Sequence, residues 1–298
     1  MRVMATMQSL VSSPDASASA VGFQFVRDLA TALSEGTVEL PSYPKIAARL
    51  QKLLADEDCD AEKLVRVLGA EPVLTARITT MANSAALNPT GRKVTGLRAA
   101  VVILGQDTLR TTATAFAMVQ LRQAAEYKGI ERPMVALWRE NVGRAAMSFV
   151  VARHTGSYSP DSAMLAGILS GIGKLYLLAR ASKYPALFAD AATYAAIVRD
   201  WHSSIAQALL ESWQSAPEVI AAVRDWSSAG EDQHASPGLA DVLAAADLLH
   251  SYSDRPEMLQ EVIPGHWAMQ RLGLKAGCAG LLADSAAEIA ALRDALGA

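Results

Sequence analysis

Residues 44–69 read PKIAARLQKLLADEDCDAEKLVRVLG, and the spacing of the apolar residues in this stretch decides the fold class. Four apolar side chains fall at positions i, i+4, i+7 and i+8 on one helical face: Ile46, Leu50, Leu53 and Leu54. After an acidic turn, Asp60 can cap a second helix that ends at Gly69. Its inward-facing residues follow the same spacing: Leu64, Val67 and Leu68. The stretch therefore predicts two short amphipathic helices.

The same pattern of helices divided by glycine and proline continues along the chain. Val and Ile rarely alternate with polar residues over four or more positions, so β-strands get little support. Gly105 closes one short helix and separates it from the next. Further helices are predicted over residues 72–81, 97–104, 108–126, 135–153, 162–178, 184–200, 203–213, 217–226, 239–252 and 281–296. The sequence therefore predicts an all-α fold.

Charge and composition exclude several classes of protein. The chain has 27 Lys and Arg against 30 Asp and Glu, a net charge of -3, and 51% hydrophobic residues, which argues against disorder. A general nucleic-acid binder would carry a basic excess, so no nucleic-acid partner is expected. The two cysteines, Cys59 and Cys278, lie far apart and make no CxxC pair, which fits a reducing cytoplasm.

The sequence also argues against a membrane protein. No uninterrupted apolar run reaches the roughly 18–20 residues that a membrane span needs. Residues 1–20 have one Arg, no sustained apolar stretch and many small polar residues, unlike a signal peptide. We therefore expect a flexible leader over residues 1–20 of a cytoplasmic protein.

Motifs for common enzyme chemistries are absent from the sequence. Gly171-Ile-Gly173 lacks the third glycine of a dinucleotide-binding loop and follows no predicted strand, so close helix packing is its expected role. No serine lies in a G-x-S-x-G elbow, and no P-loop lysine motif occurs. Four further histidines show no metal-binding spacing: His154, His234, His250 and His266.

Five blocks of sequence, taken in order, resemble the HDOD domain, a helical module of bacterial signalling proteins. The blocks are LPSYPKIAARL (40–50), EPVLTARI (71–78), MANSA (81–85), KVTGLRAAVVILG (93–105) and GILSGIGKL (167–175). Each block alone is weakly specific, but their order and spacing over residues 38–252 are characteristic. The resemblance implies a compact HD-like helical bundle in two packed subregions, residues 21–130 and 131–255, followed by a helical extension over 256–298.

The last block departs from the related HD phosphohydrolases where their metal chemistry lies. In those enzymes this segment carries a His-Asp pair that binds a divalent metal, which activates water for attack on phosphate. Here Ser170 and Gly171 occupy the two positions, and neither is a useful ligand. By the same resemblance Glu140 stands at an upstream ligand position, and His202 and Asp247 are the two remaining matches. This set makes a poor metal cage, so we expect no metal, no cofactor and no catalytic residue.

Each of these positions also has an ordinary structural explanation. His202 can cap a helix or form a hydrogen bond in the core. Asp247 can pair with a buried arginine or cap a turn, and Glu140 can lie on a solvated helix face. Lys174, which in hydrolytic relatives could reach a phosphate, can instead extend its amine to solvent from a helix end. Trp226, followed by a serine, stands where relatives often carry a His-His pair.

A small basic group surrounds the predicted loop at residues 88–91. Its members are Arg92, Lys93, Arg98 and Arg110. Without interleaved aromatic residues this group is first a solvated surface and second a contact for phosphate or for a partner. Arg92, Lys93 and Arg98 are the candidate contact residues.

The resemblance implies a non-catalytic regulatory protein that acts as an interaction or output module in bacterial signal transduction, with a signalling protein as its partner. Two alternatives stay open. One is a divergent HD-type phosphohydrolase that uses Glu140, His202 and Asp247. The other is a protein that senses a small nucleotide without turnover and uses Lys174. A homodimer is as compatible with the Leu- and Ala-rich helices as a monomer.

Overall fold

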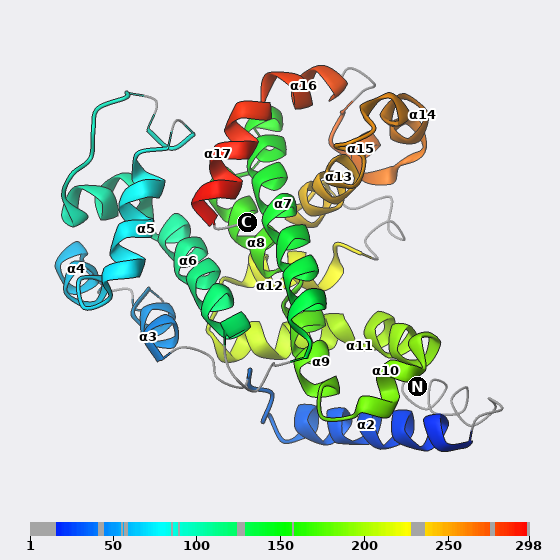
Figure 1. Cartoon of the computed structure of the whole chain (residues 1–298). Helices are drawn as coiled ribbons and strands as arrows, with labels where there is room; N and C mark the ends of the chain where they lie inside the picture. The colour runs from blue at the N-terminus through cyan, green and yellow to red at the C-terminus, as the bar shows by residue number, and fades with distance from the viewer. Residues whose placement is uncertain are drawn as a thin grey trace.

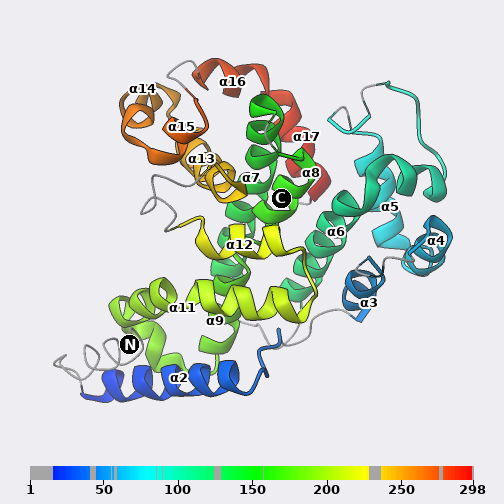
Figure 2. The ribbon, with the colours of Figure 1, turned by 180° about the vertical axis from the view of Figure 1, so that it is seen from behind.

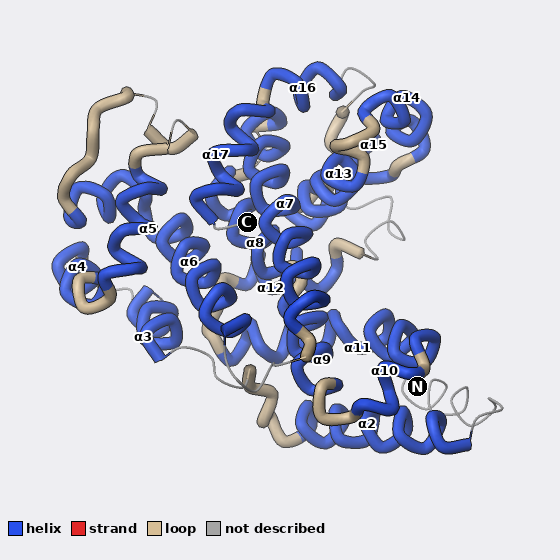
Figure 3. Tube along the Cα trace, in the orientation of Figure 1, coloured by secondary structure: helices blue, strands red, loops and turns tan. Residues whose placement is uncertain are grey.

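The computed structural model describes residues 16–40, 45–54, 56, 59–84, 86–88, 90–123, 129–156, 158–227, 236–274 and 278–296. Over these ranges the chain forms helices and loops and no strand, so the all-α prediction is confirmed (Figure 3). The α-helices are α2 (Ala16–Ser34), α3 (Lys45–Leu54), α4 (Ala61–Leu68), α5 (Pro72–Ala82), α6 (Leu97–Gln123), α7 (Glu131–Thr155), α8 (Pro160–Leu169), α9 (Ile172–Ala181), α10 (Pro185–Ala189), α11 (Ala191–Ser212), α12 (Pro217–Asp225), α13 (Leu239–Ser251), α14 (Leu259–Val262), α15 (Trp267–Arg271), α16 (Cys278–Asp284) and α17 (Ala286–Leu296). Two 3-10 helices, η3 (Pro256–Met258) and η4 (Ile263–Gly265), flank α14.

Helix α7 lies at the centre of the molecule, and α8 packs along it (Figure 1). Helices α3, α4 and α5 lie on one side and pack against α6, while α2 packs with α10 and α11 at one end. The other end is formed by α13 to α17, as the view from behind also shows (Figure 2). This arrangement brings α7, α8, α9 and α13 together around the segment that resembles the HD motif.

One continuous apolar core joins all of these helices. It contains side chains from both predicted subregions and from the predicted extension, among them Phe25, Leu50, Phe149, Leu249 and Leu292. Burying one such side chain contributes roughly 1.5–3 kcal/mol. The two halves of the chain therefore share one core.

Local rules place several helix ends correctly. Asp60 caps α4, because its Oδ1 accepts a hydrogen bond from the backbone N–H of Lys63 over 2.7 Å. Gly105 has φ 69° and ψ 176°, a conformation that is essentially restricted to glycine, and it separates a short helix from the longer part of α6. Both boundaries agree with the prediction.

Other boundaries differ from the prediction. Helix α2 begins at Ala16, so the last five positions of the predicted leader, 16–20, are helical, and residues 1–15 lie outside the described residues. The predicted helix over 162–178 is divided into α8 and α9 at Ser170 and Gly171. His202 lies inside α11, which joins most of two predicted helices, so it does not cap a helix. The predicted helix over 281–296 is two helices, α16 and α17.

The α8–α9 segment is the most apolar part of the chain. Among the described residues, Pro160–Ala181 is the one stretch long and apolar enough to cross a membrane, with a mean hydropathy of 1.5. However, 89% of its 18-residue apolar window is buried inside the protein, as expected for helices of a protein core. The apolar composition is therefore explained by packing against α7, α11 and α12.

Candidate functional site

The segment that resembles the HD motif forms the tight junction between α8 and α9. Ser170 and Gly171 are both buried there and face α7. Helices α7 and α8 approach so closely that a Cβ on Gly167 would lie 2.5 Å from the Cα of Ala145. The junction is therefore held against the central helix with no room for larger side chains on the contact face.

A buried arginine of α7, Arg144, lies at the centre of this junction. Its Nε and Nη2 donate hydrogen bonds to Oδ1 of Asp247 on α13, over 2.8 and 2.6 Å. Its Nη1 donates to Oγ of Ser170 over 2.8 Å and to Oδ1 of Asn141 over 3.3 Å. The guanidinium thus holds together α7, α13 and the α8–α9 junction. Of the two interpretations of Asp247, pairing with a buried arginine is the one that the structure shows.

The side chain of Asn141 fills the space beside Gly171. A Cβ at Gly171 would lie 2.2 Å from Oδ1 and 2.3 Å from Nδ2 of Asn141. An aspartate, which the HD enzymes carry at this position, would not fit without displacing that amide. Gly173 has a similar constraint, because its Cβ would lie 1.9 Å from the carbonyl oxygen of His202. The expected role of the two glycines in close helix packing is therefore confirmed.

Two cationic groups lie over the ring of Trp226, which follows α12. The guanidinium carbon of Arg144 lies 4.7 Å from the centre of its ring, and Nζ of Lys174 lies 5.9 Å away. Burial lowers the pKa of Lys174, and the positive charge of Arg144 lowers it further, whereas Asp247 and Glu140 act in the opposite direction. Lys174 lies in the first turn of α9 and is half-buried, so it does not extend freely into solvent from a helix end.

The two remaining candidate ligands lie near Lys174, His202 buried on α11 and Glu140 exposed on α7. His202 is buried on α11, where desolvation and the nearby charge of Lys174 lower its pKa to about 4. Its Nδ1 lies 3.4 Å from Oγ of Ser203. Glu140 is exposed on α7. The structure therefore places Glu140, Asp247 and His202 within electrostatic reach of Lys174, but among the described residues they do not form a ligand set for a metal.

The residues present do not fit the divalent metal of an HD phosphohydrolase. Among the described residues no group of three His, Cys, Asp or Glu side chains is placed to hold a metal ion. Oδ1 of Asp247 is already bonded twice to Arg144, and the Ser170 hydroxyl accepts from Arg144 and donates to the Gly167 carbonyl. A cation about 4 Å from the guanidinium would be repelled by about 4 kcal/mol for each unit of charge. Arg144 thus supplies positive charge beside the positions at which the enzymes carry their metal ligands.

The predicted basic group is only partly formed. Arg92, Lys93 and Arg98 are exposed in the segment that leads from α5 into α6, and Arg98 lies 3.8 Å from Glu62. Arg110 does not belong to this group, because it donates a hydrogen bond to the carbonyl of Leu54 at the end of α3.

Sequence reasoning missed Arg144 and Asn141. The pattern that could have found them is a row of polar residues at positions i, i+3 and i+7 of the predicted helix over 135–153, namely Asn141, Arg144 and Ser148. All three are buried. A buried polar row on a core helix requires hydrogen-bond partners, which here come from α8 and α13 for Arg144.

Comparison with protein families identifies the fold and its class. The model of the HDOD domain matches residues 40–228, so the chain belongs to the HDOD domain family. A search of curated proteins finds no match.

Solved structures with the same fold cover nearly the whole chain. A candidate metal-dependent phosphohydrolase from Shewanella amazonensis SB2B is 22% identical, with a TM-score of 0.74 over 93% of this chain and 99% of that one. A candidate phosphohydrolase from the same organism is 26% identical, with a TM-score of 0.64 over 89% of this chain and 98% of that one. A candidate signal transduction protein from Marinobacter aquaeolei VT8 is 20% identical, with a TM-score of 0.55 over 91% of this chain and 66% of that one.

Proposed function

We propose that this HDOD protein is a non-catalytic regulatory module of a bacterial, cytoplasmic signalling network and acts by binding a partner protein. The observation that carries the proposal is the position of Arg144, whose guanidinium donates hydrogen bonds to Asp247 and Ser170. A site in which an internal cation holds one carboxylate oxygen and the serine hydroxyl is poorly suited to a catalytic metal, because the cation would repel it. The name of the Marinobacter structure, a candidate signal transduction protein, supports the same role.

The surface that we propose for the partner is the basic and apolar face formed by Arg92, Lys93, Arg98, Val102 and Ile103, here called the α6 entry face. Val102 is 69% exposed and Ile103 45% exposed, so two adjacent large apolar side chains are open to solvent here. Arg98 and Val102 are four residues apart on one helical turn and so lie on the same side. This combination fits a partner with an apolar, acidic surface, since the apolar contacts add affinity and opposite charges favour encounter.

The non-catalytic part of the proposal is tested by elemental analysis of tag-free protein purified without chelator. We expect no stoichiometric iron, manganese, zinc or nickel, and no turnover of a phosphodiester when these metals are added. Near-stoichiometric metal, together with turnover that Asp247→Ala abolishes, would establish the divergent phosphohydrolase instead. The names of the two Shewanella structures make this the second candidate.

The interaction part is tested by a photo-crosslinking residue placed at Val102 in the full chain, expressed in its native host. The matched control is the same residue at Phe188, an exposed apolar position of α10, 37% exposed, away from the α6 entry face. We expect one discrete adduct from position 102 that Arg98→Glu weakens and that position 188 does not give. The same adducts from both positions, or none from position 102, would contradict the proposed surface.

A further inference from the structure

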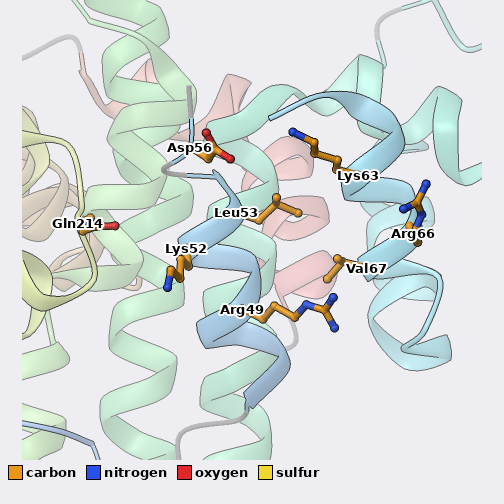
Figure 4. A pocket seen from close by; sticks show the side chains of 8 residues that line it. All are labelled: Arg49, Lys52, Leu53, Asp56, Lys63, Arg66, Val67 and Gln214. Carbon is orange, nitrogen blue, oxygen red and sulfur yellow. The ribbon is translucent and has the colours of Figure 1, made fainter. Parts of the chain in front are cut away.

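A cavity of about 520 Å³ lies between helices α3 and α4, and none of its lining residues belongs to the Arg144 junction (Figure 4). This volume lies within the roughly 300–1,000 Å³ of small-molecule sites. Its walls come from α3, from α4 and from Gln214, which follows α11. We call it the α3–α4 cavity. None of the residues considered above as relics of a metal site lines it.

The walls of the α3–α4 cavity carry an excess of positive charge. Arg49 and Lys52 of α3 and Lys63 and Arg66 of α4 line it, against one carboxylate, Asp56. The chain as a whole has a net charge of -3, so the cavity concentrates charge of the sign opposite to that of the protein. A concave surface with one sign of charge attracts ligands of the other sign, so the expected ligand is an anion.

The interior of the cavity is apolar. Leu53 of α3 points toward α4, and Val67 of α4 points back toward α3, so the two lie between the charged side chains that form the rim of the cavity (Figure 4). Val67 is buried and Leu53 half-buried. An inorganic anion would make no use of these side chains. A ligand that joins phosphate groups to a flat apolar body would use both the rim and the floor.

The arginines of the rim are available for such a ligand. Arg66 lies 3.8 Å from the carboxylate of Glu62, and both side chains are more than two-thirds exposed. Exposed ion pairs of this kind contribute little, so a bound phosphate can replace the carboxylate. Arg49 directs its guanidinium toward α4 across the cavity (Figure 4). The planar guanidinium of an arginine can bind phosphate oxygens through two parallel hydrogen bonds.

Gln214 supplies a second, independent observation. It has φ 52°, the left-handed conformation that usually belongs to glycine at the end of a helix. The hydrogen bond from Ser215 N–H to the carbonyl of Leu210 shows that α11 ends there in such a cap. A side chain at this position costs stability relative to glycine, and here it brings an amide group to the cavity wall, where it can bond polar atoms of a ligand.

We propose that the α3–α4 cavity binds a nucleotide, with its phosphates on Arg49 and Arg66 and its base over Leu53 and Val67. This inference goes beyond the regulatory role proposed above, because it supplies a small-molecule input to the module. It does not depend on Arg144 or on the α6 entry face. Its failure would therefore leave the proposed partner binding unaffected.

Calorimetric titration of the full-length protein with adenosine and guanosine diphosphates tests the proposal. We expect binding of at least one of them, weakened about tenfold or more by Arg49→Gln and by Arg66→Gln, since hydrogen bonds to charged groups are strong. The matched control is Arg139→Gln, which removes another exposed positive charge, on α7, that does not line the cavity. The melting temperature of each variant without ligand shows whether it is folded, and ligand binding raises that temperature by mass action.

Titrations with pyrophosphate and with the unphosphorylated nucleosides, at the same ionic strength, measure separately how much the phosphates and the base contribute to binding. We expect pyrophosphate to bind more weakly than the nucleotide, because it leaves Leu53 and Val67 without a partner. If pyrophosphate bound as tightly as the nucleotide, the cavity would be a general anion site, and the proposal that its ligand is a nucleotide would be wrong. No binding of either nucleotide, or equal weakening by Arg139→Gln, would overturn the site itself.

Discussion

The guanidinium of Arg144 donates two hydrogen bonds to a single oxygen of Asp247, over 2.6 and 2.8 Å. The two partners differ in exposure, because the Arg144 side chain is 5% exposed and that of Asp247 33% exposed. Loss of the carboxylate would leave a buried cation without its counter-ion, whereas loss of the cation would leave a carboxylate that water can reach. The two halves of this pair are therefore not equivalent for stability.

Asp247→Leu is expected to lower the free energy of unfolding by about 3 kcal/mol, and Arg144→Met by about 1 kcal/mol. Asp247→Leu has the larger loss because it leaves the buried guanidinium of Arg144 without a counter-ion. The guanidinium then keeps the Ser170 and Asn141 side chains as its acceptors. Urea unfolding of the three proteins, followed by circular dichroism, measures both values.

The double variant Arg144→Met/Asp247→Leu completes the cycle. It replaces both charges by apolar groups, so we expect a stability within about 1 kcal/mol of that of the unchanged protein. Additive losses in the double variant would show that the pair is not coupled, and equal single losses would contradict the argument from exposure.

Gly171→Ala is expected to destabilise the protein by about 1–3 kcal/mol, because the new Cβ would lie 2.2 Å from the Asn141 amide oxygen. Gly96→Ala is the matched control, since a Cβ at Gly96 meets no atom within 4 Å. We expect the control to change the free energy of unfolding by less than about 0.5 kcal/mol. Asn141→Ala should relieve part of the loss at Gly171, and a purely additive combination would exclude the contact as its cause.

Restoring the doublet of the HD enzymes, as Ser170→His/Gly171→Asp, is expected not to create a metal site. The added aspartate would compete with Asn141 for space, and Arg144 would remain beside it as a cation. Elemental analysis after purification from metal-supplemented medium measures the content. Adding Arg144→Ala and Asn141→Ala to the doublet tests why it fails to bind metal. The first change releases Asp247 from its arginine, and the second makes space for the new aspartate. Stoichiometric metal in the doublet variant alone would refute the role given to Arg144.

The fold could be predicted from the sequence where local rules act alone. The cap at Asp60 and the end of a helix at Gly105 depend on a side-chain oxygen and on a backbone conformation that neighbouring residues determine. The division of the predicted helix over 162–178 could not be found in this way. Its apolar residues continue across Ser170 and Gly171, and the break is understandable only from the packing of both residues against α7.

The candidate site could be predicted only in part, for a related reason. The resemblance to HD enzymes implied that Ser170 and Gly171 stand at the positions of two metal ligands, and the sequence left Asp247 with either an arginine or a turn as its partner. The arginine itself lies 103 positions away in the chain. Contacts over such a separation are set by the packing of α7 against α13, which spacing within one helix does not reveal.

His202 is expected to make the stability of the protein depend on pH between about 4 and 6.5. Burial, with the charge of Lys174, lowers its pKa from 6.5 to about 4 in the folded protein. The unfolded chain therefore binds this proton at a higher pH than the folded one, so stability is fully present above pH 6.5 and falls as the pH falls toward 4. The slope approaches about 1.4 kcal/mol per pH unit, and the total reaches about 3 kcal/mol.

His202→Gln removes this titration. We expect the slope of unfolding free energy against pH to become shallower by up to about 1.4 kcal/mol per pH unit, which corresponds to one proton, whatever the effect of the variant on stability at neutral pH. Urea unfolding at a series of pH values between 4.5 and 7.5 measures the slope for both proteins. His250, whose pKa burial also lowers, contributes in the same direction and remains in both, so the difference between the two slopes reports His202 alone. An identical slope in His202→Gln and the unchanged protein would show that His202 is protonated in the folded state as readily as in the unfolded chain.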